Sequence, residues 1–172
     1  FVGAVGETDW REGWAFGFGG GNIELVQSAS GCPSGTTSIT PVDGSTTTCE
    51  VSGTITSDLT LTEGNFYALS GAVFVGGDKE NSATLTVEPG VTVYGASGND
   101  YLVISRDSEI NANGTAENPI TFTSRDHVVG GLEAGEAGQW GGMIVLGNGE
   151  STKCPQDGTD CSLQVEGAQE GA

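Results

Sequence analysis

Short runs of alternating apolar and polar residues recur along the middle of the chain, and Gly, Pro, Asn or Asp bounds most of them. Strict alternation over so few residues predicts short β-strands with one buried side. We therefore expect an all-β fold, with strands close to residues 54–56, 59–61, 67–69, 73–75, 85–87, 91–93, 102–104, 110–112, 120–122 and 143–145. A sandwich, a barrel and a solenoid would each accommodate such strands.

The spacing of these runs favours the solenoid. Leu85–Val87 recurs as Leu102–Ile104 roughly 17 residues later, and Val91–Val93 recurs as Ile110–Ala112 roughly 19 residues later. Two or three short strands per turn of about 20 residues are typical of a parallel β-helix, in which each strand lies on its counterpart in the next coil. The pattern thus predicts a parallel β-helix with polar loops between its strands.

The alternation also predicts which side chains fill the interior of the coils. Thr86 and Thr92 should face water. The residues expected to point inward are Leu85, Val87, Val91, Val93, Leu102, Ile104, Ile110, Ile120, Phe122 and Val145.

Composition divides the chain into three parts. Residues 1–25 are aromatic and rich in Gly, and we expect them to cap a coil end or to pack against another subunit. Residues 26–50 form a Ser/Thr/Gly/Pro segment bracketed by two cysteines, which indicates a linker or a cap. Residues 51–172 contain the alternating runs and should form the coils.

Four cysteines fall into two local pairs, Cys32 with Cys49 and Cys154 with Cys161. Local pairing is one of three connectivities, and we favour it because each pair brackets a short polar loop. A zinc site would need four thiolates, or thiolates with a histidine, in one compact cluster. The spacing lacks CxxC motifs, and the single histidine is far from either pair in the sequence. Two disulfides would place the protein in an oxidising compartment, and therefore outside the cell or on its surface.

Charge excludes several partners. The chain has 23 acidic and 5 basic residues among 172, for a formal net charge of −18. Nucleic acids and anionic membrane surfaces bind clustered Lys and Arg, so neither is an expected partner. No apolar run approaches the ~20 residues of a membrane-spanning helix, so we expect no membrane insertion.

The sequence offers no convincing catalytic group. His127 is the only histidine, and no serine near it lies in a Gly-x-Ser-x-Gly turn, so we expect an exposed loop histidine. Carboxylate pairs are scattered over the chain, but none has the spacing of a calcium-binding loop. We expect no catalytic, cofactor or metal residues, with weak surface Ca²⁺ binding as an alternative.

Three stretches, Leu85–Ser124, Gly138–Gly149 and Gln164–Ala172, resemble large bacterial surface or lipoprotein-like proteins with a right-handed parallel β-helix. The resemblance covers residues 32–172. It implies a right-handed solenoid with disulfide-stapled loops and carries no established activity. Residues 1–18 resemble the segment that normally ends such proteins.

These observations favour a non-catalytic extracellular structural protein that associates with itself. Leu163-Gln164-Val165 starts a strand of a further coil, and an open coil end exposes unpaired backbone groups. We expect copies to meet head to tail and form filaments, unless the missing coils lie outside this chain. The expected packing residues are Trp10, Trp14, Phe16, Phe18, Leu163 and Val165. The alternatives are a carbohydrate-binding or adhesion module with surface glycans as partners and, less favoured, a polysaccharide-active enzyme.

Overall fold

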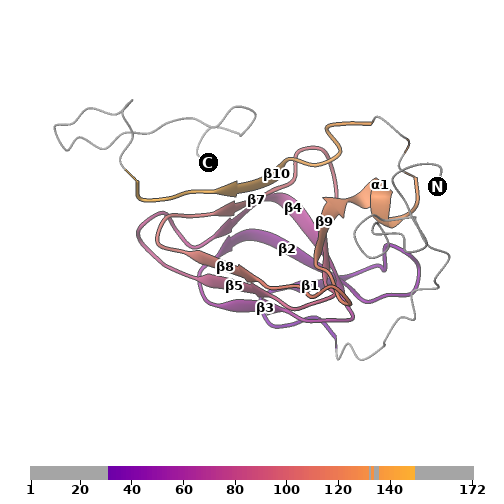
Figure 1. The fold of residues 1–172 in the computed structure, drawn as a ribbon, viewed down its shortest axis with the longest axis horizontal. Helices are drawn as coiled ribbons and strands as arrows, with labels where there is room; N and C mark the ends of the chain where they lie inside the picture. The colour runs from indigo at the N-terminus through magenta and orange to yellow at the C-terminus, as the bar shows by residue number, and fades with distance from the viewer. Residues whose placement is uncertain (1–30, 132, 134–135, 150–172) are drawn as a thin grey trace, which may run out of the picture.

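The chain winds into coils whose strands lie on one another in parallel (Figure 1). The computed structural model describes residues 31–131, 133 and 136–149. Within them the strands are β1 (Thr37–Ile39), β2 (Thr48–Ile55), β3 (Leu59–Leu61), β4 (Phe66–Val75), β5 (Thr84–Val87), β6 (Thr92–Gly95), β7 (Tyr101–Ile104), β8 (Glu109–Ala112), β9 (Thr121–Ser124) and β10 (Gly142–Val145), with one short helix, α1 (Arg125–Val128).

Each coil contributes a strand segment to three faces. The first face stacks residues 48–52 of β2, the first half of β4, then β6 and β9. The second face stacks the end of β2, the second half of β4, then β7 and β10. The third face stacks β3, β5 and β8. Every pairing within these three stacks is parallel, so the described chain forms the expected all-β fold built from coils.

Side chains in register form columns along the interior. On the second face, Val75, Ile104 and Val145 occupy one column. On the third face, Leu85 pairs with Ile110 in another. Parallel strands that bury one side stack such residues directly over each other. The columns are therefore what joins one coil to the next.

The expected interior is largely confirmed. Six of its residues are at most 2% exposed, namely Leu85, Val87, Val91, Val93, Leu102 and Ile104. Ile110, Ile120 and Phe122 are partly buried against the same core. Val145 lies in register with Ile104 and so points to the expected side, but its side chain is 65% exposed and not buried. It shares the column of Ile104 but lies on the last described strand of that face.

The expected repeat is also wrong in its pairing. Leu85–Val87 stacks on Ile110–Ala112, 25 residues later, and not on Leu102–Ile104. Leu102–Ile104 stacks instead on Val73–Val75, 29 residues earlier. The three faces carry similar apolar runs. Runs that belong to two different faces of the chain therefore looked like one repeat with a shorter period.

The segment 31–50 lies over the first coil. β1 runs antiparallel to the start of β2, with Ser38 opposite Cys49. A disulfide joins Cys32 to Cys49, which is fully buried, so this part of the cysteine prediction is confirmed. Because β1 occupies the outer edge of residues 48–50, no parallel strand can be added there.

Candidate functional site

At one corner of the coil, between the first and second faces, the chain inserts more residues between the two strands with each successive coil. In the first two coils the chain turns this corner inside a strand, at Gly53 in β2 and at Gly71 in β4, where φ is +67° and +71°. The third coil inserts residues 96–100, and the fourth inserts residues 125–141. Excursions on a rigid scaffold commonly carry binding residues, so this corner is the first candidate site.

A buried carboxylate fastens the corner. Asp100 is 5% exposed, and its side chain accepts hydrogen bonds from the backbone N–H of Gly71 (2.7 Å) and of Ser97. Its carbonyl oxygen accepts a third bond from the N–H of Gly141 at 2.7 Å. Asp100 thereby ties three consecutive coils together, and its role in the structure is to position the corner.

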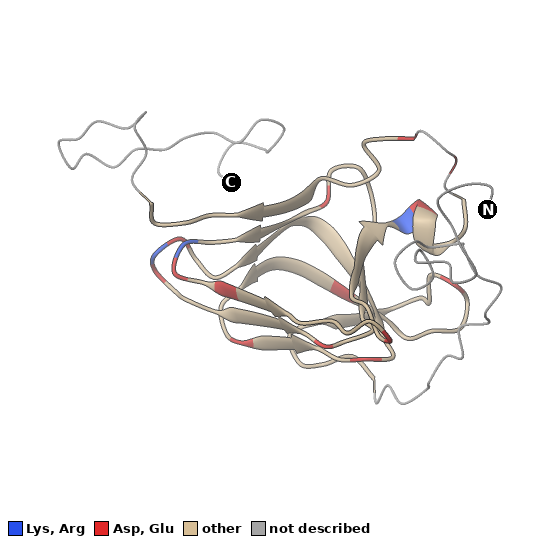
Figure 2. Cartoon of the chain, in the orientation of Figure 1, with Lys and Arg blue, Asp and Glu red and all other residues tan. Residues whose placement is uncertain are grey.

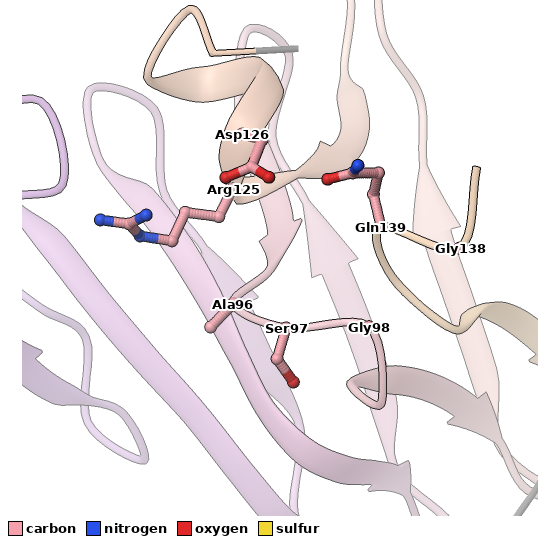
Figure 3. Close-up of a pocket in the computed structure, with 7 residues that line it drawn as sticks. All are labelled: Ala96, Ser97, Gly98, Arg125, Asp126, Gly138 and Gln139. Carbon is pink, nitrogen blue, oxygen red and sulfur yellow. The ribbon is translucent and has the colours of Figure 1, made fainter. Parts of the chain in front are cut away.

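Between the two longest excursions lies a small polar pocket of about 190 Å³ (Figure 3). The Asp126 and Gln139 side chains are turned toward each other, while the guanidinium of Arg125 points in another direction. The pocket is lined by Ala96, Ser97, Gly98, Arg125, Asp126, Gly138 and Gln139. Ligand pockets are usually larger and mainly apolar, so this one suits a small polar group or part of a sugar.

The chemistry available in the pocket is hydrogen bonding. Gln139 donates to the Glu136 carboxylate at 3.2 Å. The Ser97 hydroxyl accepts from the backbone of Asn99 at 3.4 Å. A nucleophile would need a base within hydrogen-bond reach, and no such contact to Ser97 occurs among the described residues. The arrangement can hold a polar ligand, and the described part of the chain shows no means of reacting with it.

His127 lies close to this corner and is not the exposed loop residue that we expected. It belongs to α1, is half-buried, and its Nδ1 lies 2.6 Å from the hydroxyl of Thr123. The side chain of Ser124 caps the helix by accepting from the backbone N–H of His127. A serine directly before Arg-Asp-His is a helix N-cap signal, and it could have identified this turn from the sequence.

Trp140 packs against the core from the same corner and is partly buried there. Gly95 makes this approach possible, since a Cβ atom built on it would lie 2.4 Å from the Cβ of Trp140. The last excursion is therefore anchored by a close contact between its aromatic side chain and the backbone of the coil before it.

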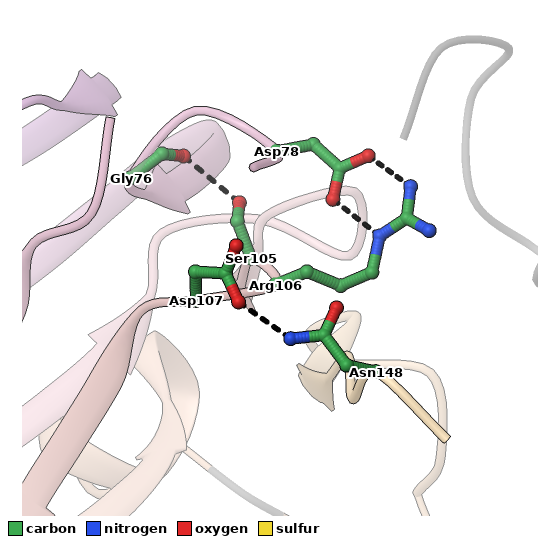
Figure 4. A network of polar contacts seen from close by, with 6 residues as sticks. All are labelled: Gly76, Asp78, Ser105, Arg106, Asp107 and Asn148. Atoms are coloured by element: carbon green, nitrogen blue, oxygen red, sulfur yellow. Dashed lines mark hydrogen bonds and ion pairs between the residues drawn. The ribbon is translucent and has the colours of Figure 1, made fainter. Parts of the chain in front are cut away.

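A second polar cluster lies at the corner between the second and third faces (Figure 4). Arg106 binds Asp78 of the preceding coil through two nitrogens, and this hydrogen-bonded ion pair lowers the pKa of Asp78. Asn148 of the following coil donates to Asp107. Figure 2 shows the basic residues gathered here and on α1, whereas acidic residues occur all over the described chain. This cluster links coils in the same way as Asp100 does.

The last strand of the second face exposes apolar side chains. Met143 and Val145 of β10 are 38% and 65% exposed, whereas Leu102 and Ile104, beneath them in the columns, are both 1% exposed. Exposed apolar groups that continue a buried column mark a surface made for contact. This surface is the second candidate site, and we name it the open rung.

The remaining predictions on site residues lie outside the described residues. They concern the packing residues Trp10, Trp14, Phe16, Phe18, Leu163 and Val165, the pair Cys154 and Cys161, and the segment 1–25. Sequence reasoning did not single out Asp126 or Gln139 as ligands, because no motif joins residues on separate excursions.

Within the described ranges, no group of three His, Cys, Asp or Glu residues is placed to hold a metal ion. No helix there is long and apolar enough to cross a membrane.

Comparison with known proteins gives one match. The model of a family described as a pectate-lyase-like β-helix domain matches residues 53–170, more than half of the chain. No curated protein and no solved structure matches the chain.

Proposed function

The chain belongs to the family of pectate-lyase-like β-helix domains, and we propose that it serves as a non-catalytic structural β-helix of an extracellular or cell-surface protein that associates with itself. Right-handed winding is part of the proposal, since parallel strands connected within one sheet almost always cross over that way. A bacterial surface or lipoprotein-like protein, working without a cofactor, is the setting that the sequence resemblance favours.

The observation that carries this proposal is the open rung. Met143 and Val145 extend columns that are otherwise buried, and β10 pairs, within the described residues, with β7 alone. An unpaired strand edge is a template for another strand. A second copy would satisfy both the backbone groups and the apolar side chains.

The other end of the described coils offers a matching edge. β1 covers only residues 48–50 of β2, so Gly53–Ile55 pairs, within the described part, with β4 alone. These residues lie on the second face, as β10 does. Head-to-tail contact would place Met143 and Val145 against Gly53 and Ile55 of the second copy. Such a heterologous contact repeats without closing, which produces filaments.

Net charge sets the conditions for association. A charge of −18 on every copy opposes contact, and salt screens that repulsion over a Debye length of about 10 Å at 0.1 M. Association should therefore strengthen as salt rises, since the contact itself is apolar and made by the backbone.

The test is sedimentation of the full chain at micromolar concentration in 0.5 M salt, with electron microscopy of the pellet. Val145→Asp should abolish assembly without unfolding the monomer, because position 145 is exposed. Thr60→Asp adds the same charge at an exposed outward position of β3 and should assemble like the wild type. A monomeric wild type, or assembly of Val145→Asp, would overturn the proposal, and release of unsaturated sugar from polysaccharide would overturn its non-catalytic part.

The polar pocket favours a second candidate, a carbohydrate-binding or adhesion module. Asp126 and Gln139 line the pocket with carboxylate and amide groups that are turned toward each other (Figure 3), and such groups hydrogen-bond sugar hydroxyls. Binding on a glycan array that is lost in Asp126→Ala and in Gln139→Ala would support this function. Binding that survives both substitutions would reject the pocket as its site.

A further inference from the structure

The three faces are visited in a fixed order along the chain. In each coil the chain passes from the first face to the second and then to the third, as β6, β7 and β8 do. β9 and β10 repeat the first two steps for the next coil. The strand that follows β10 in this order belongs to the third face, where it would lie on β8.

The outer edge of β8 is open in the way that this order requires. Ile110 is half-buried and Ala112 is exposed, whereas Leu85 and Val87, beneath them in register, are both 2% exposed. β8 pairs, among the described residues, with β5 alone. The third face therefore ends in an uncovered rung, as the second face does.

The middle residues of the stacked strands point outward and form a column on each face. The polarity of this column indicates which further strand could be added to the face. On the third face the outward residues are Thr60, Thr86 and Asn111, and all three are polar. On the second face they are Thr54, Phe74, Val103 and Ile144, of which the first is polar and the three in the later coils are apolar. The next apolar–polar–apolar run in the sequence is Leu163-Gln164-Val165. Its central glutamine continues a column of the third face that is polar in every described coil, whereas on the second face it would follow the apolar Phe74, Val103 and Ile144.

The sequence around this run agrees with the third face. On that face Glu63-Gly64 lies two residues beyond β3, and Glu88-Pro89-Gly90 follows β5. Glu166-Gly167 follows residue 165 in the same way. The family match extends through residue 170, so it includes this run. The intervening residues 146–162 exceed the eight, 76–83, that make the same passage from β4 to β5, so the chain is long enough.

We propose that the free edge of β8 is the docking surface for residues 163–165 of this chain. The register is parallel, with Ile110 beside Leu163, Asn111 beside Gln164 and Ala112 beside Val165. Residues 163–165 lie outside the described part, and the proposal rests on the rung that they would cover. It does not depend on self-association, because β10 stays free for a second copy.

Engineered disulfides test this register. Neighbouring strands lie about 4.8 Å apart, within the Cα separations of about 4.4–6.8 Å that a disulfide spans. The test pair is Asn111→Cys with Gln164→Cys, and the matched control is Ile144→Cys with Gln164→Cys, which would form only if the run lay on β10. Both are made with Cys154 and Cys161 replaced by Ser. Trypsin cleavage after Arg106, Arg125 and Lys153 places positions 111, 144 and 164 on three separate peptides.

A cross-link between positions 111 and 164 within one chain, formed several-fold faster than the control, is the expected result. An equal or faster cross-link from position 144, a cross-link only between chains, or none would overturn the proposal. Hydrogen exchange gives a test without cysteines. Leu163→Asp should accelerate exchange of the β8 amides several-fold and Gln164→Asp should not, and equal behaviour of the two variants would also overturn it.

Discussion

Ile104 and Val145 lie beside each other in one interior column, in parallel register, yet Ile104 is 1% exposed and Val145 is 65% exposed. The difference arises from position in the stack, since both side chains point the same way. In this fold, the strand of the following coil covers an interior side chain as much as the neighbouring strands of its own coil do. The energetic value of an apolar residue should therefore fall toward the last rung of each face.

The column of these residues allows a direct test with one substitution at two positions. Val75 lies between Ile55 and Ile104 in the column and is fully buried, so Val75→Ala should lower the free energy of unfolding by about 2 kcal/mol through lost burial and a cavity. Val145→Ala should change it by less than about 0.5 kcal/mol. Chemical denaturation followed by circular dichroism measures both. Equal losses at the two positions would contradict the assignment of the open rung.

The disulfide between Cys32 and Cys49 closes a loop with a sequence separation of 17 residues. Loops of this length contribute about 3 kcal/mol in the chain-entropy account. Replacing both cysteines by Ser should lower stability by about that amount, with the strands of the later coils retained. Thermal unfolding with and without reductant provides the comparison, in a background with Cys154 and Cys161 replaced by Ser. Reductant should destabilise the protein that keeps Cys32 and Cys49 and should have no effect on the double variant.

Gly95 should not tolerate even a methyl group. A Cβ there would meet the Cβ of Trp140 at 2.4 Å, so Gly95→Ala must displace the tryptophan or the strand. We expect a loss of 1–3 kcal/mol, about the cost of overpacking, and a red shift of Trp140 fluorescence in a background with Trp10 and Trp14 replaced by Phe. Gly77→Ala is the control, because its nearest neighbour would lie 3.6 Å away. Unchanged fluorescence in Gly95→Ala would refute the contact.

Asp43 should make stability depend on pH in acid. Burial raises its pKa, but hydrogen bonds from Thr46 and Ser45 outweigh this and lower the value from 3.8 to about 2. A lowered folded pKa stabilises the protein above the unfolded value, and this contribution disappears as the pH falls from about 4 through 2. Because Asp43 is exposed, the contribution is about 1 kcal/mol or less.

Asp43→Asn should remove that dependence. The wild type should melt above the variant at pH 6, and the two melting temperatures should converge at pH 2. A difference of equal size at both pH values would show that the hydrogen bonds do not depend on the charge of Asp43.

The alternation of apolar and polar residues predicted the strands because it reflects which residues within each strand are buried. It located β5 closely, since Leu85 and Val87 are buried and the threonines beside them are not fully buried. β7 was located as an apolar run, since all four of its residues are buried. The alternation could not pair them, because the runs of all three faces look alike and the excursions make each coil a different length. β1 and the start of β2 escaped notice, since the burial of Thr48 and Cys49 depends on the strand and the disulfide laid over them.

The pocket could not be found from the sequence for a related reason. Ser97, Asp126 and Gln139 meet because two insertions of unequal length leave the same corner, and no spacing along the chain encodes that meeting. The open rung was easier to predict. The sequence predicted a strand that includes Met143 and Val145, and only the exposure of their side chains had to be learned from the structure.

The cap over the first coil also gives folding a direction. Residues 31–55 contain the disulfide, β1 and all of β2, so they can assemble before any later coil has left the ribosome. Domains generally fold as their N-terminal parts emerge first. Since β1 blocks parallel growth on its side of residues 48–50, a newly emerged strand of the first face finds a ready template on the opposite side alone. The capped strand would thus act as a seed, and the coils would be laid down in the order in which they are synthesised.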